Sequence, residues 1–173
     1  PSAAHPLMTR VFERVNAHHP GIRLNVVEAQ GSELDAMLDS GMVDLAIVFR
    51  YHRPHTREEA LLCEVHTYLI AAPGDALTAQ AAVHFKQLNG LRLVLPRRPS
   101  QWRNALDETA RSLGFRLQAV VEADSLTMQK ELVAHTAGLY SVLGPFSFAP
   151  ELRSKRLQAS KLVQPDLSRH VSL

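Results

Sequence analysis

The sequence has little cysteine, little net charge and no long hydrophobic run. Its 173 residues include a single cysteine, Cys63, so no disulfide can form within the chain. A lone cysteine is compatible with a reducing environment, and we expect a cytoplasmic protein. No apolar run reaches the roughly 18–20 residues that span a bilayer, so we expect no membrane contact. The formal net charge is only +2, which is too small to indicate a nucleic-acid-binding surface on this chain.

Motifs of catalytic and metal sites are also missing. The sequence contains no P-loop, no GxGxxG and no Ser-His-Asp order. His52 and His55 have a possible metal-ligand spacing, but they lack a cysteine or clear carboxylate partner, so we interpret them as surface histidines. Cys63 and His66 would point to opposite faces of a strand, which disfavours a nucleophile–base pair, and we expect Cys63 to be a buried small residue. We therefore expect no enzyme, no metal ion and no cofactor.

The hydrophobic pattern switches repeatedly between a helical period and a strand period. It predicts helices within 4–18, 32–40, 82–88, 100–113 and 125–137. It predicts strands within 22–26, 43–49, 61–72, 91–96, 115–123, 139–144 and 169–173. The alternation falls into two blocks, about 1–66 and 67–167. It predicts an α/β fold with mixed, mostly parallel sheets and helices on both faces.

Three segments together form a family-like pattern. The first, NAHHPGIRLNVVEAQGSELDAMLDSGMVDLAIVF (16–49), has its diagnostic positions at Glu28, Gly31, Ser32, Leu34, Leu38, Gly41, Asp44, Leu45, Ala46 and Ile47. The others are LPRRPSQWRNALDETARSLGF (95–115) and EADSLTMQKELVAHTAGLYSVLGP (122–145). The pattern resembles the effector-binding domain of LysR-type transcriptional regulators. Within that family, LPRRPSQWR is similar to the nitrogen-assimilation-control branch.

The sequence departs from the family pattern at two places. The family's G-x-G before the late strand is Gly138-Leu139-Tyr140 here, so the second glycine is lost. The family's Leu-Pro after that strand is Leu143-Gly144-Pro145, which is one residue longer. We expect the loop after this strand to differ in shape from that of its relatives.

The resemblance implies two Rossmann-like lobes of the type II periplasmic-binding-protein kind, joined by two crossing strands near 66–68 and 167–170. Lobe I would comprise 1–66 plus 168–173, incomplete at both ends, and lobe II 67–167. The implied partners are a small-molecule effector, DNA through an N-terminal helix-turn-helix absent from this chain, and a second copy. A homodimer or homotetramer is expected. Met8, Phe12, Leu132 and Val133 are expected in the core, with a place at the interface as the alternative.

Serine precedes or opens each of four expected helices, at Ser2, Ser32, Ser100 and Ser125. The first amide N–H groups of a helix lack intrahelical partners and attract anions. By resemblance, we expect an anionic effector between the lobes, bound by Ser2, Gly31, Ser32, Arg97, Arg98, Ser100 and Ser125, with Phe146 as a wall. The alternatives are that the serines only cap their own helices and that the arginines are solvated loop charges.

Two other functions use related scaffolds. A periplasmic solute-binding protein of a transporter has the same fold type but requires export. An enzyme would require a catalytic base or a covalent cofactor site, and the sequence offers no convincing one. The sensing domain of a regulator is therefore the preferred interpretation, and the transporter protein is the alternative.

Overall fold

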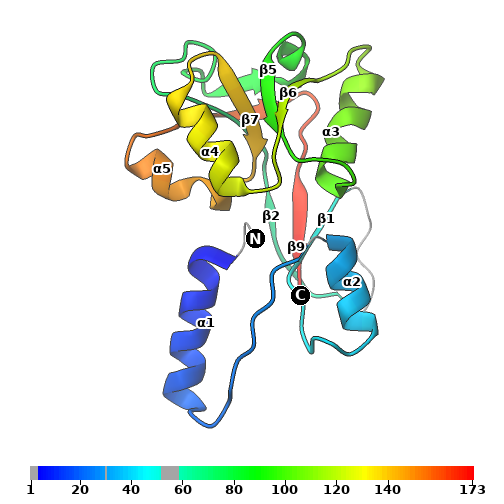
Figure 1. Cartoon of the computed structure of the whole chain (residues 1–173), viewed down its shortest axis with the longest axis vertical. Coiled ribbons are helices and arrows are strands. Elements are labelled where there is room, and N and C mark those ends of the chain that lie inside the picture. Colours follow the sequence, from blue (N-terminus) through cyan, green and yellow to red (C-terminus); the bar gives the residue numbers. More distant parts are fainter. Residues whose placement is uncertain (1–3, 30, 52–58) are drawn as a thin grey trace.

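The computed structural model describes residues 4–29, 31–51 and 59–173, which form an α/β structure with two sheets (Figure 1). Its helices are α1 (Ala4–His18), α2 (Gly31–Asp39), α3 (Gln101–Ser112), α4 (Leu126–His135) and α5 (Ala149–Arg153), with 3-10 turns η1 (Phe85–Leu88) and η2 (Pro145–Ser147). Its strands are β1 (Val48–Arg50), β2 (Leu61–Val65), β3 (Tyr68–Ala71), β4 (Ala82–His84), β5 (Arg92–Leu95), β6 (Gln118–Glu122), β7 (Leu139–Leu143), β8 (Gln158–Val163) and β9 (Arg169–Ser172).

The sheets are mixed, as the sequence predicted. The larger sheet has the order β4-β8-β3-β7-β5-β6, and the smaller has the order β1-β9-β2. Strand β5 pairs in parallel with β6 and β7, and β4 pairs in parallel with β8. The other four pairings between described strands are antiparallel. Parallel pairs are thus fewer than expected, because β2, β3 and β9 join antiparallel pairs as the chain passes between the sheets.

Two chain segments connect the sheets. The expected strand over 61–72 breaks at His66–Thr67, so that β2 belongs to the smaller sheet and β3 to the larger one. The chain returns between β8 and β9. Thr67 joins the two connections, because its Oγ1 donates to the Leu167 carbonyl (2.6 Å) and its carbonyl accepts from the Leu162 amide (2.9 Å). The connections lie where the sequence predicted the crossing strands.

The larger sheet is buried on both faces. Successive residues of a strand point to opposite faces, so Leu93 and Leu95 pack with Leu106 of α3, whereas Val94 packs with Val133 of α4. All five side chains are fully buried. Val133 is therefore a core residue, as expected, and the alternative of an interface position does not apply to it. Because these contacts anchor α3 and α4 on the sheet, the first residues of both helices lie at fixed positions.

The smaller sheet is less covered. Residues 22–26, expected as a strand, form no strand here, and Ile22, Leu24 and Val26 are exposed. No described strand lies beside them to complete a hydrogen-bonded ladder. Cys63 is exposed rather than buried as expected, because β2 is an edge strand with only its last residue buried. Figure 1 shows α1 standing apart from both sheets.

Candidate functional site

A cavity of about 270 Å³ lies between the smaller sheet and the larger one. From the side of the smaller sheet it is lined by the start of α2 and by β1. From the side of the larger sheet it is lined by the starts of α3 and α4 and by the end of β7. Open α/β sheets bind ligands at such edges, beyond the carboxyl ends of their strands. The cavity is therefore the candidate site.

The starts of α2 and α3 approach each other across the cavity. A Cβ placed on Gly31, the first residue of α2, would lie 3.3 Å from Oε1 of Gln101, the first residue of α3. Unpaired amides and the helix dipole give each start a partial positive charge. Two such ends pointing at one space favour an anionic group there.

The serine caps differ in their relation to the cavity. Ser100 is buried, its hydroxyl accepts from the Arg103 amide (3.3 Å), and it lines the cavity. Ser125 is exposed and its hydroxyl accepts from the Met128 amide (3.3 Å). Its neighbours in sequence line the cavity, but Ser125 itself does not. Its observed contact is thus that of an ordinary N-cap.

The two loop arginines lie outside the cavity lining and are engaged by carboxylates. Arg97 Nε donates to Asp124 Oδ2 (2.6 Å), and this bond holds the pKa of Asp124 below its usual value. Arg98 donates to Asp107, which raises the pKa of the Arg98 guanidinium. Asp124 lines the cavity, so Arg97 compensates a negative charge at its edge. A direct clamp by either arginine on an anion stays a prediction.

The positively charged group among the described lining residues is Arg169, the first residue of β9. This residue is 5% exposed, and its guanidinium carbon lies 4.7 Å from the Trp102 ring centroid, 5.2 Å from that of Phe49 and 5.9 Å from that of Tyr51. Within the described chain the guanidinium has no carboxylate partner, and Nε has no acceptor. Aromatic faces stabilise a cation by about 0.5–2 kcal/mol, yet a buried charge normally also has a counter-charge.

Gly144 creates the space for this guanidinium. A Cβ at this position would lie 1.8 Å from Arg169 Nη2 and 3.0 Å from its Cζ. Gly144 follows β7 and is the extra residue of the Leu143-Gly144-Pro145 stretch. Glycine at this point allows the backbone to approach the guanidinium closely.

The remaining sites predicted from the sequence divide as follows. Gly31 and Ser32 line the cavity with Ser100. Phe146 does not line it and is 42% exposed, although its neighbour Ser147 does line it. Ser2, like His52 and His55, lies outside the described residues. The part of each residue in effector binding stays a prediction.

Most of the lining residues were not expected as site residues, among them Arg169, Trp102 and Gln129. Arg169 lies in a short terminal strand, and only its position at the predicted crossing near 167–170 pointed to the cleft. The indole Nε1 of Trp102 donates to the Val142 carbonyl (3.1 Å), which fixes the ring. Gln129 is 1% exposed, and its amide donates to the Ala123 carbonyl (2.6 Å). No short motif marks these residues.

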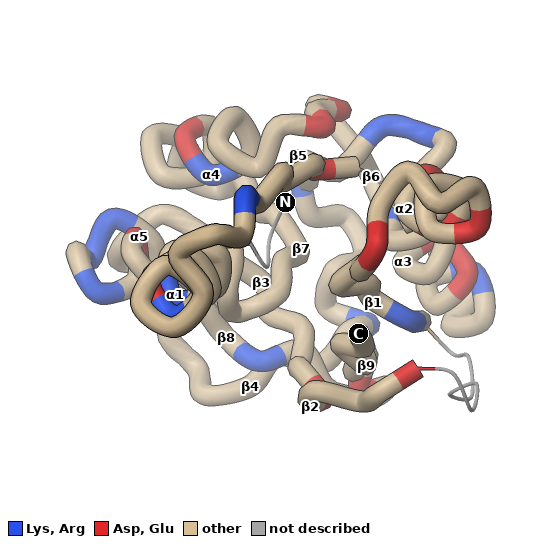
Figure 2. Tube along the Cα trace, turned by 90° about the horizontal axis from the view of Figure 1, so that it is seen from below, with Lys and Arg blue, Asp and Glu red and all other residues tan. Residues whose placement is uncertain are grey.

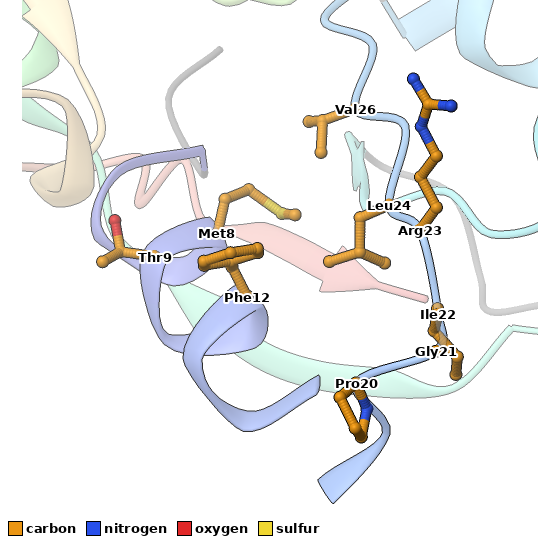
Figure 3. Close-up of a pocket in the computed structure, with 9 residues that line it drawn as sticks. All are labelled: Met8, Thr9, Phe12, Pro20, Gly21, Ile22, Arg23, Leu24 and Val26. Atoms are coloured by element: carbon orange, nitrogen blue, oxygen red, sulfur yellow. The ribbon is translucent and has the colours of Figure 1, made fainter. Parts of the chain in front are cut away.

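A second hollow of about 700 Å³ lies between α1 and residues 20–26. Figure 3 shows Leu24 and Val26 pointing toward Met8 and Phe12 of α1, while Arg23 points elsewhere. Apart from Arg23 and Thr9 its lining side chains are apolar. With no buried polar group to orient a ligand, this hollow is a weaker candidate than the cavity around Arg169.

Charged residues are unevenly distributed. Figure 2 shows acidic positions along α2 and basic positions next to α5. The basic group contains Arg153, Lys155 and Arg156, of which Arg156 pairs with Glu131 (2.9 Å).

No helix of the described ranges combines the length and apolarity that a membrane crossing requires. Among these same residues, no cluster of three potential metal ligands occurs.

Comparisons with known proteins support one family. The model of the family described as LysR substrate binding domain matches residues 1–173. The regulatory domain of CcmR from Synechocystis PCC6803, solved in complex with 2-PG, is similar with a TM-score of 0.81 and 15% identity, covering 99% of this chain and 82% of that domain. The H2O2-bound C206S mutant of Corynebacterium glutamicum OxyR has a TM-score of 0.76 and 18% identity, with 99% and 55% covered. Full-length CbnR in complex with its target DNA has a TM-score of 0.69 and 13% identity, with 99% and 57% covered.

These matches agree with the fold expected from the sequence. The chain spans most of the CcmR regulatory domain but little more than half of the OxyR and CbnR chains. At these identities the solved structures establish the fold alone. The family match does not favour the alternative of a transporter's solute-binding protein.

Proposed function

The chain belongs to the LysR substrate-binding domain family, and from this premise we propose that it senses a small anionic effector for a DNA-binding transcriptional regulator. The effector occupies the cavity between the two sheets. Binding changes the angle between the parts of the chain that the two connections join. A ligand shifts such an equilibrium only if it binds one arrangement more tightly than the other.

One observation supports this proposal most directly. The buried guanidinium of Arg169, which has no carboxylate partner among the described residues, lines the same cavity as the starts of α2 and α3. All three favour negative charge at one place. The cavity is near the lower end of the roughly 300–1,000 Å³ typical of ligand pockets, so the effector is small.

The proposal extends to the parent protein. We assign 1–66 with 168–173 to one lobe and 67–167 to the other, with the connections as the hinge. The parent protein is proposed to be cytoplasmic, without enzymatic activity, to bind DNA through a helix-turn-helix domain and to act as a dimer or tetramer. The stretch LPRRPSQWR at 95–103 is the basis for placing it in the nitrogen-assimilation-control branch.

Calorimetric titration of the chain with a panel of small organic acids tests the site. We expect at least one acid to bind with one-to-one stoichiometry. Gln101→Phe places a ring at the start of α3, where Gln101 is exposed and lines the cavity, and should abolish this binding. Gln80→Phe is the matched control, because Gln80 is exposed and does not line the cavity. Unchanged binding by Gln101→Phe would show that the effector binds elsewhere.

A further inference from the structure

We propose that Arg169 is the residue that recognises the effector's charge, and that the effector is a small monocarboxylate with an uncharged, mostly apolar remainder. This inference rests on the function proposed above and deepens it. It specifies the chemical class of the ligand and the side chain that selects it.

The cavity lining carries few charges. Of the lining residues that the structure describes, only Arg169 and Asp124 carry a formal charge at neutral pH. Asp124 is compensated by Arg97, whose Nε lies 2.6 Å from its Oδ2 and whose amide donates to its Oδ1 (3.1 Å). One positive charge therefore remains without a counter-charge. A ligand with one negative charge balances it, whereas a dianion would leave a charge in excess.

The surroundings of the Arg169 guanidinium determine its orientation. Arg169 is flanked by the rings of Trp102, Phe49 and Tyr51, and the backbone of Gly144 lies directly against the guanidinium. These contacts limit its movement. A planar guanidinium held in place can donate two parallel hydrogen bonds to a carboxylate.

The other lining residues bear on the rest of the ligand. About half of the lining residues are apolar, and these are Ala29, Leu34, Ile47, Phe49, Tyr51, Pro96, Pro99, Trp102, Leu126 and Leu143. The polar groups around them are neutral hydroxyls and amides, such as those of Ser147 and Gln129. Such a surface is suited to an apolar body with at most a few uncharged polar groups.

Trp102 supplies the readout for a test. It is the single tryptophan of the chain, and its ring lies 4.7 Å from the Arg169 guanidinium carbon. A ligand on Arg169 should change its fluorescence saturably. The probes are 3-methylbutanoate, hexanoate and phenylacetate, each beside its primary amide. Succinate and inorganic phosphate, both at about pH 8 where they are mainly dianions, are the comparisons.

We expect at least one monocarboxylate to bind, and its amide to bind at least about tenfold more weakly. Arg169→Gln should weaken binding of the acid by about 10- to 150-fold, as expected for a lost charge-assisted hydrogen bond. Arg169→Lys, which keeps the charge without the planar fork, should restore part of the affinity. Arg156→Gln is the matched control and should leave affinity unchanged, because Arg156 is exposed, pairs with Glu131 and lies outside the lining.

The outcomes separate this inference from the proposed function. If the acids bind Arg169→Gln as tightly as the unaltered chain, yet are lost in Gln101→Phe, the cavity is the effector site and recognition by Arg169 is wrong. If the amides bind equally well, or succinate or phosphate binds more tightly, the monocarboxylate class is wrong. If none of these anions binds the unaltered chain, the proposed function fails as well. Should Arg169→Gln not fold, Gly144→Ala replaces it, since its methyl group displaces the guanidinium, and undiminished binding would overturn the inference.

Discussion

Replacing Gly144 with alanine tests the contact on which the candidate site is built. The new methyl group would lie 1.8 Å from Arg169 Nη2, 3.0 Å from Cζ and 3.6 Å from Nη1. Backbone strain does not contribute, because Gly144 has φ −85° and ψ 156°, an extended conformation open to alanine. The guanidinium must move, although it is buried and flanked by three aromatic rings.

The size of the effect follows from two opposing terms. Overpacking a buried site costs about 1–3 kcal/mol. Replacing glycine with alanine in a permitted conformation gains about 0.4–1 kcal/mol through the unfolded state. We therefore expect Gly144→Ala to lower the free energy of unfolding by about 1–2 kcal/mol. For a chain of this length that corresponds to a Tm lower by about 2–8 °C.

Urea denaturation of a double-mutant cycle provides the assay. In the Arg169→Gln background, which lacks the guanidinium, Gly144→Ala should be neutral or slightly stabilising, so the coupling energy should be about 2 kcal/mol. Gly21→Ala is the matched control, because nothing lies within 4 Å of its Cβ position. If Gly144→Ala is equally destabilising with and without the Arg169 guanidinium, our account of this contact is refuted.

Three further predictions concern charged and titrating groups. Arg50→Gln should lower the free energy of unfolding by about 1–3 kcal/mol at pH 7. Because Arg50 lowers the pKa of Glu59, the Arg50–Glu59 pair stabilises the fold above the unfolded pKa of Glu59, near 4.5. The urea midpoints of the variant and the unaltered chain should therefore converge as the pH falls below that value. Burial, aided by the Asp75 hydrogen bond, raises the pKa of Tyr140 to about 12, so one tyrosinate absorbance step should occur near that pH and vanish in Tyr140→Phe. The hydroxyl stabilises the fold below pH ~10, and this contribution is lost as the pH rises through about 12. A single step near pH 10 for all tyrosines would contradict the raised pKa. Arg97→Gln should weaken binding of a carboxylate several-fold at low salt and less at high salt, because Asp124 at the cavity edge loses its partner and repels the ligand. If the variant binds with the same affinity at both salt concentrations, repulsion by Asp124 is contradicted.

Local signals in the sequence predicted much of the larger sheet. Ser100 and Ser125 start α3 and α4 as N-caps, and glycines with positive φ follow both helices at Gly114 and Gly138. These features depend on a few neighbouring residues, which is why a sequence pattern can identify them. The sequence offers no comparable signal for β8, the longest of the described strands, or for the five-residue helix α5.

Features that depend on tertiary contacts were not predictable in the same way. Residues 22–26 alternate like a strand, but a strand exists only where a neighbouring strand completes its hydrogen bonds. The run over 61–72 is one hydrophobic pattern, yet it serves two sheets. Periodicity describes which residues prefer burial, and it does not describe which sheet buries them.

The two departures from the family pattern now have physical explanations. Tyr140, in place of the second glycine, donates its hydroxyl to Asp75 Oδ2 (2.7 Å). Burial raises the pKa of Asp75, but hydrogen bonds from Thr78 and Tyr140 outweigh it, so the pKa is lowered overall. Gly144, the extra residue, accommodates Arg169. Neither pairing was visible in the sequence, because the partners are distant along the chain.

The bond from Thr67 to Leu167 has a mechanical consequence. It fastens both connections together only two residues before Arg169. The guanidinium that lines the cavity is therefore anchored, through β9, beside the place where the chain passes between the two sheets. A force applied to this side chain acts close to their linkage.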